Sequence, residues 1–345
     1  MKNRTASLFE HQYVERDSGR VFTESPFADW IVNFFYCKER EDISLLYRLL
    51  GSRWLSTMLA WVNYDFPLGQ TVSGIQHFLK RCGINLEECL ENPQRLDSAR
   101  KVFERQIRYW QRRPMDTDPR SVVCPADSRV LVGSLDQNAI LFLKGKFFDY
   151  DELLGTDREQ WLSVFRNGDF VICRLTPEKY HYNHTPVAGL VLDSYENTGA
   201  YHSCNPGSVI AMATPYSKNK RCITIIDTEV TDGTRVGLVA MIEIVALMIG
   251  DIVQCYSDVQ YVNPRSVTPG TYLRKGCPKS LYRPGSSTTV LLFQEGRVQF
   301  AQDLVRNMHR ADIKSRFSQG FGRPLVETDV KVRSTIATKK KNQRR

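Results

Sequence analysis

The sequence predicts an α+β protein in which a helical N-terminal region precedes a β-rich domain. Apolar residues recur at helical spacing before residue 113, whereas short β-branched runs dominate after residue 120. A change to Pro, Asp and Thr over 114–120 separates the two patterns. We therefore expect a helical region over 1–113, a second domain over 114–338 and a basic tail over 339–345.

The expected helices follow from apolar periodicity. In the first region, leucines at 45, 46, 49 and 50 share one helical face, and a second periodic segment runs over 96–110 until Pro114 ends it. In the second region, Thr156 and Glu159 have the spacing of a capping box before Trp161. A last helix is expected over 297–308.

The expected strands are short runs of β-branched and aromatic residues. They lie at 122–123, 130–132, 139–142, 171–172, 187–192, 223–226 and 288–293. The most apolar stretch, 236–253, is long enough to span a bilayer but contains Glu243 and Asp251. We therefore interpret it as buried strands.

Composition indicates a globular cytoplasmic protein, peripheral to a membrane if it contacts one. The 345 residues are 42% hydrophobic and 25% charged, which is enough for a sizeable core. Nine cysteines, an odd number without a Cys-x-x-Cys pair, indicate reduced thiols and no zinc site. The amino terminus lacks the apolar segment of a secretory signal.

The net charge of +9 predicts attraction to phosphate groups, so both anionic lipid surfaces and nucleic acid are candidate partners. Part of the charge lies in the tail, where the alternative is a solvated, disordered end. The other cations that we expect to contribute are Lys218, Lys220, Arg221, Arg274, Lys275 and Lys279.

Three groups of side chains could carry chemistry. His181 and His184 lie between two prolines, Asp127 lies in a turn between two apolar runs, and Ser286 and Ser287 precede a predicted strand. Each has an ordinary structural explanation when taken alone. The histidine pair lacks a third ligand at local spacing, so no metal site is expected. Together, Asp, His and Ser are the groups of a nucleophilic triad.

A hydrolase is the first candidate for such a triad, but the pattern Gly-x-Ser-x-Gly is absent. The serines also feed into a strand, whereas the nucleophile of an α/β-hydrolase feeds into a helix. The segment reads Tyr-Arg-Pro-Gly-Ser-Ser-Thr-Thr-Val-Leu-Leu-Phe from 282, followed by Gly296-Arg297-Val298. It resembles the cleavage segment of the phosphatidylserine decarboxylases, which are self-cleaving proenzymes that depend on a pyruvoyl group.

Three upstream motifs resemble the same family in the same order. Arg113-Pro114 with 122–127 is similar to Arg-Pro … Val-Val-Ser-Pro-Ala-Asp-Gly, and 142–155 is similar to Lys-Gly … Leu-Leu-Gly. The segment 174–186 is similar to Arg-Leu-x-Pro-x-x-Tyr-His-Arg-x-His-x-Pro. The first 110 residues match only weakly.

The resemblance implies a role for each candidate residue. Ser287 attacks the preceding carbonyl, the chain is cut between 286 and 287, and Ser287 becomes the pyruvoyl cofactor; Ser286 is the alternative nucleophile. His184 is the base, within one hydrogen bond of the Ser287 hydroxyl, and Asp127 orients its ring. His181 delivers a proton to the substrate α-carbon, for which a pKa near neutrality is suitable.

Two departures from the family concern the substrate pocket. Tyr182 stands where the family has arginine, and Glu243 stands where Gly-Ala is common. A carboxylate within an apolar run is costly unless it is paired, so Glu243 belongs either to an ion pair or to the pocket.

The leading hypothesis is a decarboxylase that converts phosphatidylserine to phosphatidylethanolamine and CO₂ on an anionic membrane. Aromatic residues at 34–36, Trp54 and Trp61 would supply an apolar patch or, alternatively, a helix core. One alternative is a decarboxylase of a free L-amino acid such as tryptophan. Another is an uncleaved, inactive homologue that binds lipid or nucleic acid. For the enzyme we expect a two-chain protein built from its own fragments, a homodimer, and no nucleic-acid partner.

Overall fold

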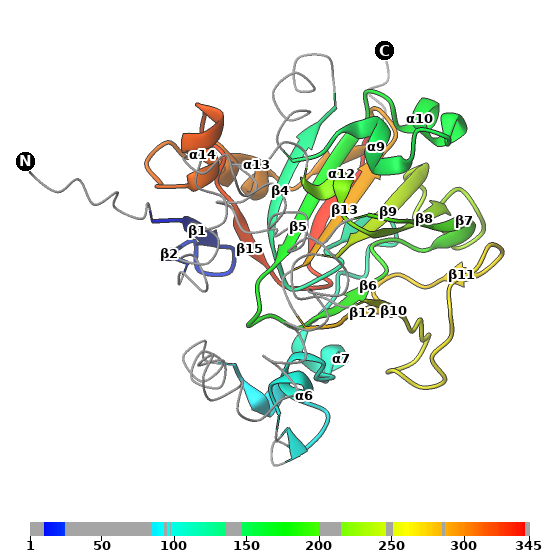
Figure 1. Ribbon diagram of the computed structural model, residues 1–345, viewed down its shortest axis with the longest axis horizontal. Coiled ribbons are helices and arrows are strands. Elements are labelled where there is room, and N and C mark those ends of the chain that lie inside the picture. The colour runs from blue at the N-terminus through cyan, green and yellow to red at the C-terminus, as the bar shows by residue number, and fades with distance from the viewer. Residues whose placement is uncertain are drawn as a thin grey trace, which may run out of the picture.

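A ten-stranded β-sheet forms the centre of the protein (Figure 1). The computed structural model describes residues 10–24, 84–92, 95–96, 98–135, 147–199, 215–245, 251–284 and 287–341. In spatial order the strands are β11 (Tyr272–Leu273), β7 (Gly189–Asn197), β8 (Arg221–Asp227), β9 (Leu238–Ile244), β13 (Ser287–Phe293), β5 (Asp169–Leu175), β4 (Ser128–Ser134), β15 (Thr328–Val330), β1 (Gln12–Glu15) and β2 (Val21–Thr23). Neighbouring strands are antiparallel, except that β1 and β15 are parallel.

Two smaller sheets accompany the large one. One contains β10 (Ile252–Gln254), β12 (Pro278–Tyr282) and β6 (Tyr182–His184), and the other contains β14 (Val298–Phe300), β16 (Thr335–Lys339) and β3 (Ser121–Val123). The helices are η3 (Leu86–Glu88), α6 (Ala99–Phe103), α7 (Tyr109–Arg112), α9 (Tyr150–Leu154), α10 (Glu159–Phe165), α12 (Pro215–Lys218), α13 (Gln302–Met308) and α14 (Arg316–Phe321).

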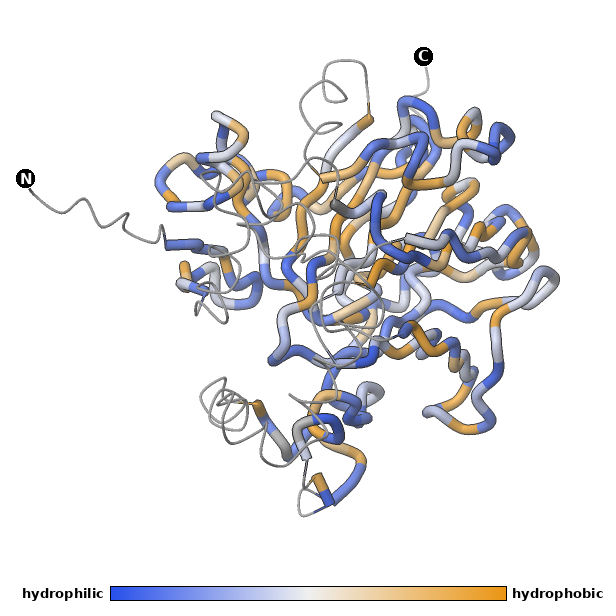
Figure 2. The backbone as a smooth tube through the Cα atoms, viewed as in Figure 1, coloured by the Kyte–Doolittle hydropathy of each residue, from blue (hydrophilic) through white to orange (hydrophobic). Residues whose placement is uncertain are grey.

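Strand β13 lies in the middle of the sheet and is buried along its whole length. Val290 and Leu292 pack into the hydrophobic cluster on one face, and Leu291 and Phe293 pack into the cluster on the other. This arrangement explains why the strand reads as a continuous β-branched and apolar run. Figure 2 shows the same concentration of hydrophobic residues along the central strands. The residue at the start of β13 is therefore held in a rigid environment.

The helical region expected over 1–113 is not confirmed. Residues 10–24 form the hairpin of β1 and β2, which extends the large sheet. The expected helix over 96–110 is two short helices, α6 and α7. The chain between them pairs with residues 88–90 instead, because Leu90 N–H donates to Gln106 O at 2.8 Å and Arg108 N–H donates to Glu88 O at 2.9 Å. The leucines at 45–50 lie outside the described residues.

Most strands expected from the β-branched runs are confirmed, as β3, β4, β5, β7, β8 and β13. The run at 139–142 lies outside the described residues. The apolar stretch 236–253 contains β9 and β10, as expected for buried strands. Among the helices that the structure describes, none has the length and apolar character needed to cross a membrane.

Two helix boundaries predicted from the sequence are wrong. Helix α10 begins at Glu159, and Arg158 rather than Thr156 takes the N-cap position without a side-chain cap. The helix expected over 297–308 begins only at Gln302, because residues 298–300 form β14 and pair with β16. Both differences arise from tertiary packing that overrides a local signal.

Candidate active site

Ser287 is the first residue of β13 and is fully buried. Its backbone pairs with Leu175 of β5. Among the residues that the structure describes, its Oγ has no hydrogen-bond partner, which is unusual for a buried hydroxyl and costs about 1–3 kcal/mol. Ser286, the alternative nucleophile, lies outside the described residues. The expectation that Ser287 leads directly into a strand is confirmed.

Tyr282, at the end of β12, fixes the start of β13. Its hydroxyl donates to Thr288 O at 2.9 Å and accepts from Ile244 N–H at 3.2 Å. Thr288 and Ile244 are register partners, and they form the last pair of the ladder between β13 and β9. The buried phenol thus joins three strands one residue beyond Ser287.

His184 ends β6 and lies beside the turn that carries Asp127, since His184 N–H donates to Pro125 O at 2.6 Å. The ring Nδ1 lies 2.9 Å from Gly276 O, and the ring Nε2 lies 3.0 Å from the Tyr180 hydroxyl. Because a carbonyl only accepts, Nδ1 carries the proton and Nε2 accepts. Burial lowers the pKa of His184 to about 3, so the ring is neutral at physiological pH.

The backbone at Gly276 allows this contact with His184. Its φ of +74° lies in the left-handed region, and a Cβ there would meet Met115 Sδ at 2.4 Å. A side chain at this position would be strained by the positive φ and would require Met115 to move.

Asp127 lies in the turn between β3 and β4 and is buried. Its Oδ1 accepts from Arg113 Nε at 3.0 Å and from Val332 N–H at 2.8 Å, and its Oδ2 accepts from Arg113 Nη2 at 2.8 Å. Burial alone would raise the pKa of Asp127, but the charge and hydrogen bonds of Arg113 hold it below its ordinary value. Asp127 is therefore ionised.

The expected chain of hydrogen bonds from Asp127 through His184 to Ser287 is not formed. Arg113 is hydrogen-bonded to the Asp127 carboxylate. Gly276 O and the Tyr180 hydroxyl are hydrogen-bonded to the two ring nitrogens of His184. The Ser287 hydroxyl has no partner among the described residues. The structure brings Asp127 and His184 onto neighbouring segments without a direct contact. The negative charge of Asp127 nevertheless raises the pKa of His184, against the larger effect of burial.

His181 lies between a turn and β6, and it is fully buried. Its ring stacks on Phe103 with centroids 3.5 Å apart, and its Nε2 lies 3.3 Å from Pro177 O. Its Nδ1 has no hydrogen-bond partner within the described part of the chain. Burial and the charge of Arg105 lower its pKa to about 3, well below the near-neutral value of an unperturbed histidine.

The two residues that depart from the family also occupy defined positions. Tyr182 is buried in β6, stacks on Tyr180 with centroids 5.4 Å apart, and accepts a hydrogen bond from Gln106 Nε2 at 3.2 Å. Glu243 in β9 is fully buried, and its Oε2 lies 2.7 Å from Lys279 Nζ. Of the two interpretations left open for Glu243, the structure shows an ion pair.

Several residues of the site were not found from the sequence. Arg113 belonged to a motif but had no assigned partner, and Lys279 was expected on the surface although it is fully buried. Arg221 is buried too, and its Nε donates to Leu153 O at 2.8 Å.

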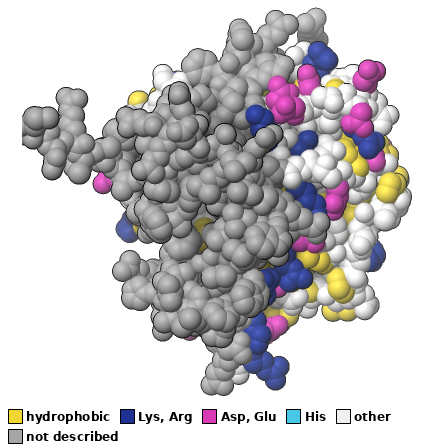
Figure 3. Space-filling view, in the orientation of Figure 1, with side chains coloured by type: hydrophobic (Ala, Val, Ile, Leu, Met, Phe, Trp, Pro, Cys, Tyr) yellow, Lys and Arg dark blue, Asp and Glu magenta, His cyan; other side chains and the backbone are white. Residues whose placement is uncertain are grey.

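The basic surface is consequently smaller than expected. Lys220 is paired with Asp251 at 3.1 Å, and Lys275 Nζ donates to the backbone at Asp118 and Ser121. On the face seen in Figure 3, the described surface carries Lys and Arg side chains interspersed with Asp and Glu.

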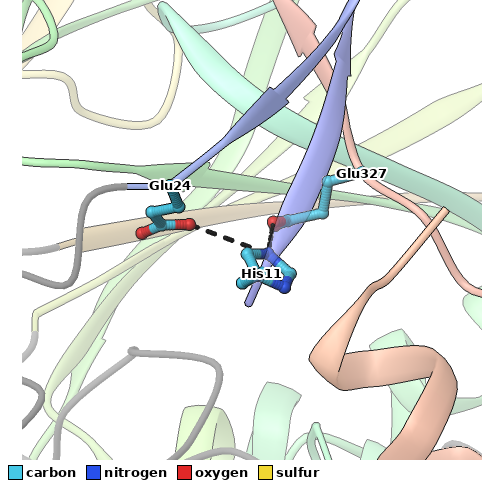
Figure 4. A group of neighbouring side chains, drawn as sticks. All are labelled: His11, Glu24 and Glu327. Atoms are coloured by element: carbon cyan, nitrogen blue, oxygen red, sulfur yellow. Dashed lines mark hydrogen bonds and ion pairs between the residues drawn. The ribbon is translucent and has the colours of Figure 1, made fainter. Parts of the chain in front are cut away.

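A second buried cluster joins the N-terminal hairpin to β15 and contains His11, Glu24 and Glu327 (Figure 4). These are ligand types of a metal site, and His11 Nε2 lies 2.8 Å from Glu327 Oε2. However, Arg174 Nη2 lies 2.7 Å from Glu24 Oε2 and 2.6 Å from Glu327 Oε2, and Arg129 also pairs with Glu24. Two guanidinium groups already compensate both carboxylates, so we interpret the cluster as an ion-pair network.

Comparisons with known proteins agree with the order of the sequence motifs. A family profile described as phosphatidylserine decarboxylase matches residues 99–323, which is more than half of the chain. By class, the chain is therefore a decarboxylase, a carboxy-lyase. It belongs to the phosphatidylserine decarboxylase family.

Individual relatives cover most of the chain. It is 26% identical over 313 residues to a phosphatidylserine decarboxylase proenzyme of Fusobacterium nucleatum, covering 90% of this chain and 97% of the relative. It is 29% identical over 316 residues to the proenzyme of Chlamydia trachomatis, covering 91% and 97%. It is 30% identical over 232 residues to phosphatidylserine decarboxylase proenzyme 2 of Oryza sativa, covering 66% of this chain and 34% of the relative.

Proposed function

We propose that this chain is a proenzyme that cleaves itself between Ser286 and Ser287 and then converts phosphatidylserine to phosphatidylethanolamine and CO₂. The observation that supports this most directly is the buried, unpartnered Ser287 hydroxyl at the start of a central strand. Ser287 stands at the position of the reactive serine in the cleavage segment of the family.

Self-cleavage requires a base for the Ser287 hydroxyl, and His184 is the candidate. Its neutral Nε2 can accept a proton, and it now accepts a hydrogen bond from the Tyr180 hydroxyl. We infer that the Tyr180 hydroxyl gives up this contact, or passes the proton on, when Ser287 reacts. Asp127, which is paired with Arg113, stabilises the protonated ring by its charge.

The alkoxide of Ser287 would attack the carbonyl carbon of residue 286 and convert the peptide bond to an ester. Elimination then breaks the ester, leaves a carboxylate at residue 286 and releases residue 287 as a new chain end. The residue left at 287 is a dehydroalanine, which tautomerises to an imine; one water molecule then hydrolyses the imine, which releases ammonia and yields the pyruvoyl group. Ser287 fits this group because it is small, buried and free of hydrogen bonds to the surrounding strands. When formed, the pyruvoyl group supplies the electron sink for loss of CO₂.

His181 is the candidate for proton delivery to the substrate α-carbon. Its Nδ1 is unpartnered, and stacking on Phe103 fixes the plane of its ring. Because burial lowers its pKa to about 3, the neutral ring must first acquire the proton that it delivers.

Mass spectrometry of the purified protein tests maturation before any substrate is chosen. We expect a large fragment ending at residue 286 and a small one over 287–345 that carries a hydrazine-reactive carbonyl. Ser287→Ala should stay intact, whereas Ser286→Ala should still cleave. A small fragment heavier by one serine residue would identify Ser286 as the nucleophile. A single uncut parent chain would support an inactive binding protein instead.

The substrate is tested on the matured protein by CO₂ release. Vesicles that contain phosphatidylserine should be turned over, and free L-tryptophan should not. Turnover of the free amino acid alone would support the alternative substrate, which the presence of Tyr182 in place of arginine favours.

A further inference from the structure

A closed cluster of buried polar side chains lies between the large sheet and the sheet of β10, β12 and β6. Its members come from five strands and are Asn183, Glu243, Gln254, Lys279, Ser280 and Thr289. All of them are fully buried except Gln254, which is partly exposed. The central pair is Glu243 with Lys279.

The carboxylate of Glu243 has no acceptor capacity to spare. Its Oε2 accepts from Lys279 Nζ at 2.7 Å and from Gln254 Nε2 at 3.0 Å. Its Oε1 accepts from Asn183 Nδ2 at 3.2 Å and from the Ser280 hydroxyl. Four hydrogen bonds fill the lone-pair sites of a carboxylate, so the Glu243 carboxylate has no free site for a ligand.

The cluster reaches the start of β13 through one hydroxyl. Thr289 Oγ1 donates to Asn183 Oδ1 at 2.8 Å and lies 3.0 Å from the Tyr282 hydroxyl. Thr289 is the register partner of Glu243, and it lies two residues after Ser287 on the same strand face. The side chains of Ser287 and Thr289 therefore leave β13 in the same direction, but only that of Thr289 is hydrogen-bonded.

A buried ion pair is a weak means of stabilising a fold, because apolar residues of similar volume often do as well or better. In some proteins such a pair instead specifies one geometry. Here the geometry concerns Thr289, which lies two residues after Ser287.

We propose that this cluster is a positioning device for self-cleavage, with Thr289 as the contact through which it acts. By fixing Thr289 and, with Tyr282, the carbonyl of Thr288, the cluster holds the start of β13 in register. The Ser287 hydroxyl is thereby kept without a partner and next to the bond that it attacks. The inference rests on the proposed function, and it adds residues that no reacting atom touches.

The test compares rates of self-cleavage after the full chain is synthesised in a cell-free system. The rate is measured from the appearance of the fragment 287–345. Thr289→Val keeps the shape and the β-branch but removes the hydroxyl. We expect cleavage to slow by about 10- to 100-fold, the effect of a small misplacement of a reacting group. Thr289→Ser, which keeps the hydroxyl, should restore most of the rate.

Thr224→Val is the matched control. Thr224 is also fully buried in the large sheet, but its hydroxyl has no partner. The same chemical change there should leave the cleavage rate unaltered. Once cleaved, the Thr289→Val protein should have the kcat of the parent. Its melting temperature should fall, because Asn183 Oδ1 loses its donor. A general loss of stability would instead lower cleavage and kcat together.

The outcomes separate this inference from the function on which it rests. If the parent is never cut, both proposals are overturned. If the parent is cut and Thr289→Val is cut at the same rate, only the positioning role is overturned. Unchanged cleavage with a raised KM for phosphatidylserine would also overturn it, and would place the cluster in the substrate pocket.

Discussion

The guanidinium of Arg174 forms a buried two-point ion pair with Glu327, with Nε–Oε1 and Nη2–Oε2 distances of 2.9 and 2.6 Å. Arg174 lies in β5, and Glu327 directly precedes β15. Cleavage between 286 and 287 would place the two residues on different chains. Burial would raise the pKa of Glu327, but Arg174 outweighs it and lowers that pKa to about 2. The pair therefore joins the two fragments in its fully charged form.

Glu327→Gln should destabilise the protein, because it leaves part of the buried charge of Arg174 uncompensated. Arg174 retains Glu24, so we expect the lower end of the usual cost, about 3 kcal/mol in the free energy of unfolding. The measurements are the urea midpoint and the retention of the small fragment in size-exclusion chromatography.

Asp303→Asn is the control, since the Arg16–Asp303 pair also crosses the cleavage point. It is more exposed, with 19% and 34% of the two side chains accessible, so its loss should cost less than about 1 kcal/mol. Equal effects of the two substitutions would show that burial does not determine the strength of these contacts.

Asp127→Asn should slow self-cleavage by at least about 100-fold, the usual contribution of general acid–base catalysis. The carboxylate raises the pKa of His184, so a neutral amide makes the histidine a weaker base. The measurement is the rate at which the small fragment appears.

Glu88→Gln provides the comparison for Asp127→Asn. Glu88 is the other carboxylate on Arg113, with a distance of 2.8 Å to Nη2, but it is partly exposed. We expect its loss to leave the cleavage rate close to that of the parent. A rate as slow as that of Asp127→Asn would mean that Asp127 acts only by holding Arg113.

Binding to anionic vesicles should depend on the last cations that the structure describes. Lys340 and Lys341 are exposed at the end of the chain. Replacing both with glutamine should weaken binding by about 2 kcal/mol, at about 1 kcal/mol for each cation near the surface. Co-sedimentation at low and high salt measures this.

Lys314→Gln is the control for the vesicle experiment, because Lys314 is 71% exposed but lies elsewhere, 3.7 Å from Glu10. If all three substitutions weaken binding equally, net charge rather than the tail attracts the protein to the membrane.

The sequence predicted the strands at the centre of the large sheet, because they read as β-branched runs. It did not predict the N-terminal hairpin, whose strands are only four and three residues long. That hairpin is fixed by contacts such as His11 with Glu327, which lie 316 residues apart and leave no local pattern.

The motifs identified the candidate site residues but not their partners. Asp127 pairs with Arg113 rather than with His184, a choice that depends on the approach of α7 to the turn after β3. Lys279 was expected to be exposed because lysines usually are. Its burial is compensated by Glu243 and Gln254, which come from other strands and leave no local pattern in the sequence.

Stability should fall as the pH drops from about 6.5 to 5, because His181 and His184 are buried in the neutral form. Burial lowers the pKa of each to about 3, whereas an unfolded histidine has a pKa near 6.5. Between these values the unfolded chain binds protons that the folded chain does not. The free energy of unfolding therefore rises with pH up to about 6.5, by up to about 1.4 kcal/mol per pH unit for each histidine.

Titration of the buried carboxylates does not change the stability between about pH 5 and 6.5. The pKa values of Asp127 and Glu327 are lowered on folding, so their contribution is present above an unfolded pKa of about 4 and is lost only below it. Urea midpoints between about pH 7.5 and 5 measure the dependence on the histidines. His181→Gln should reduce the slope by about half relative to the parent, since one of the two titrating groups is removed. A parent with the same stability at both ends of this range would contradict the neutral, buried state of both rings.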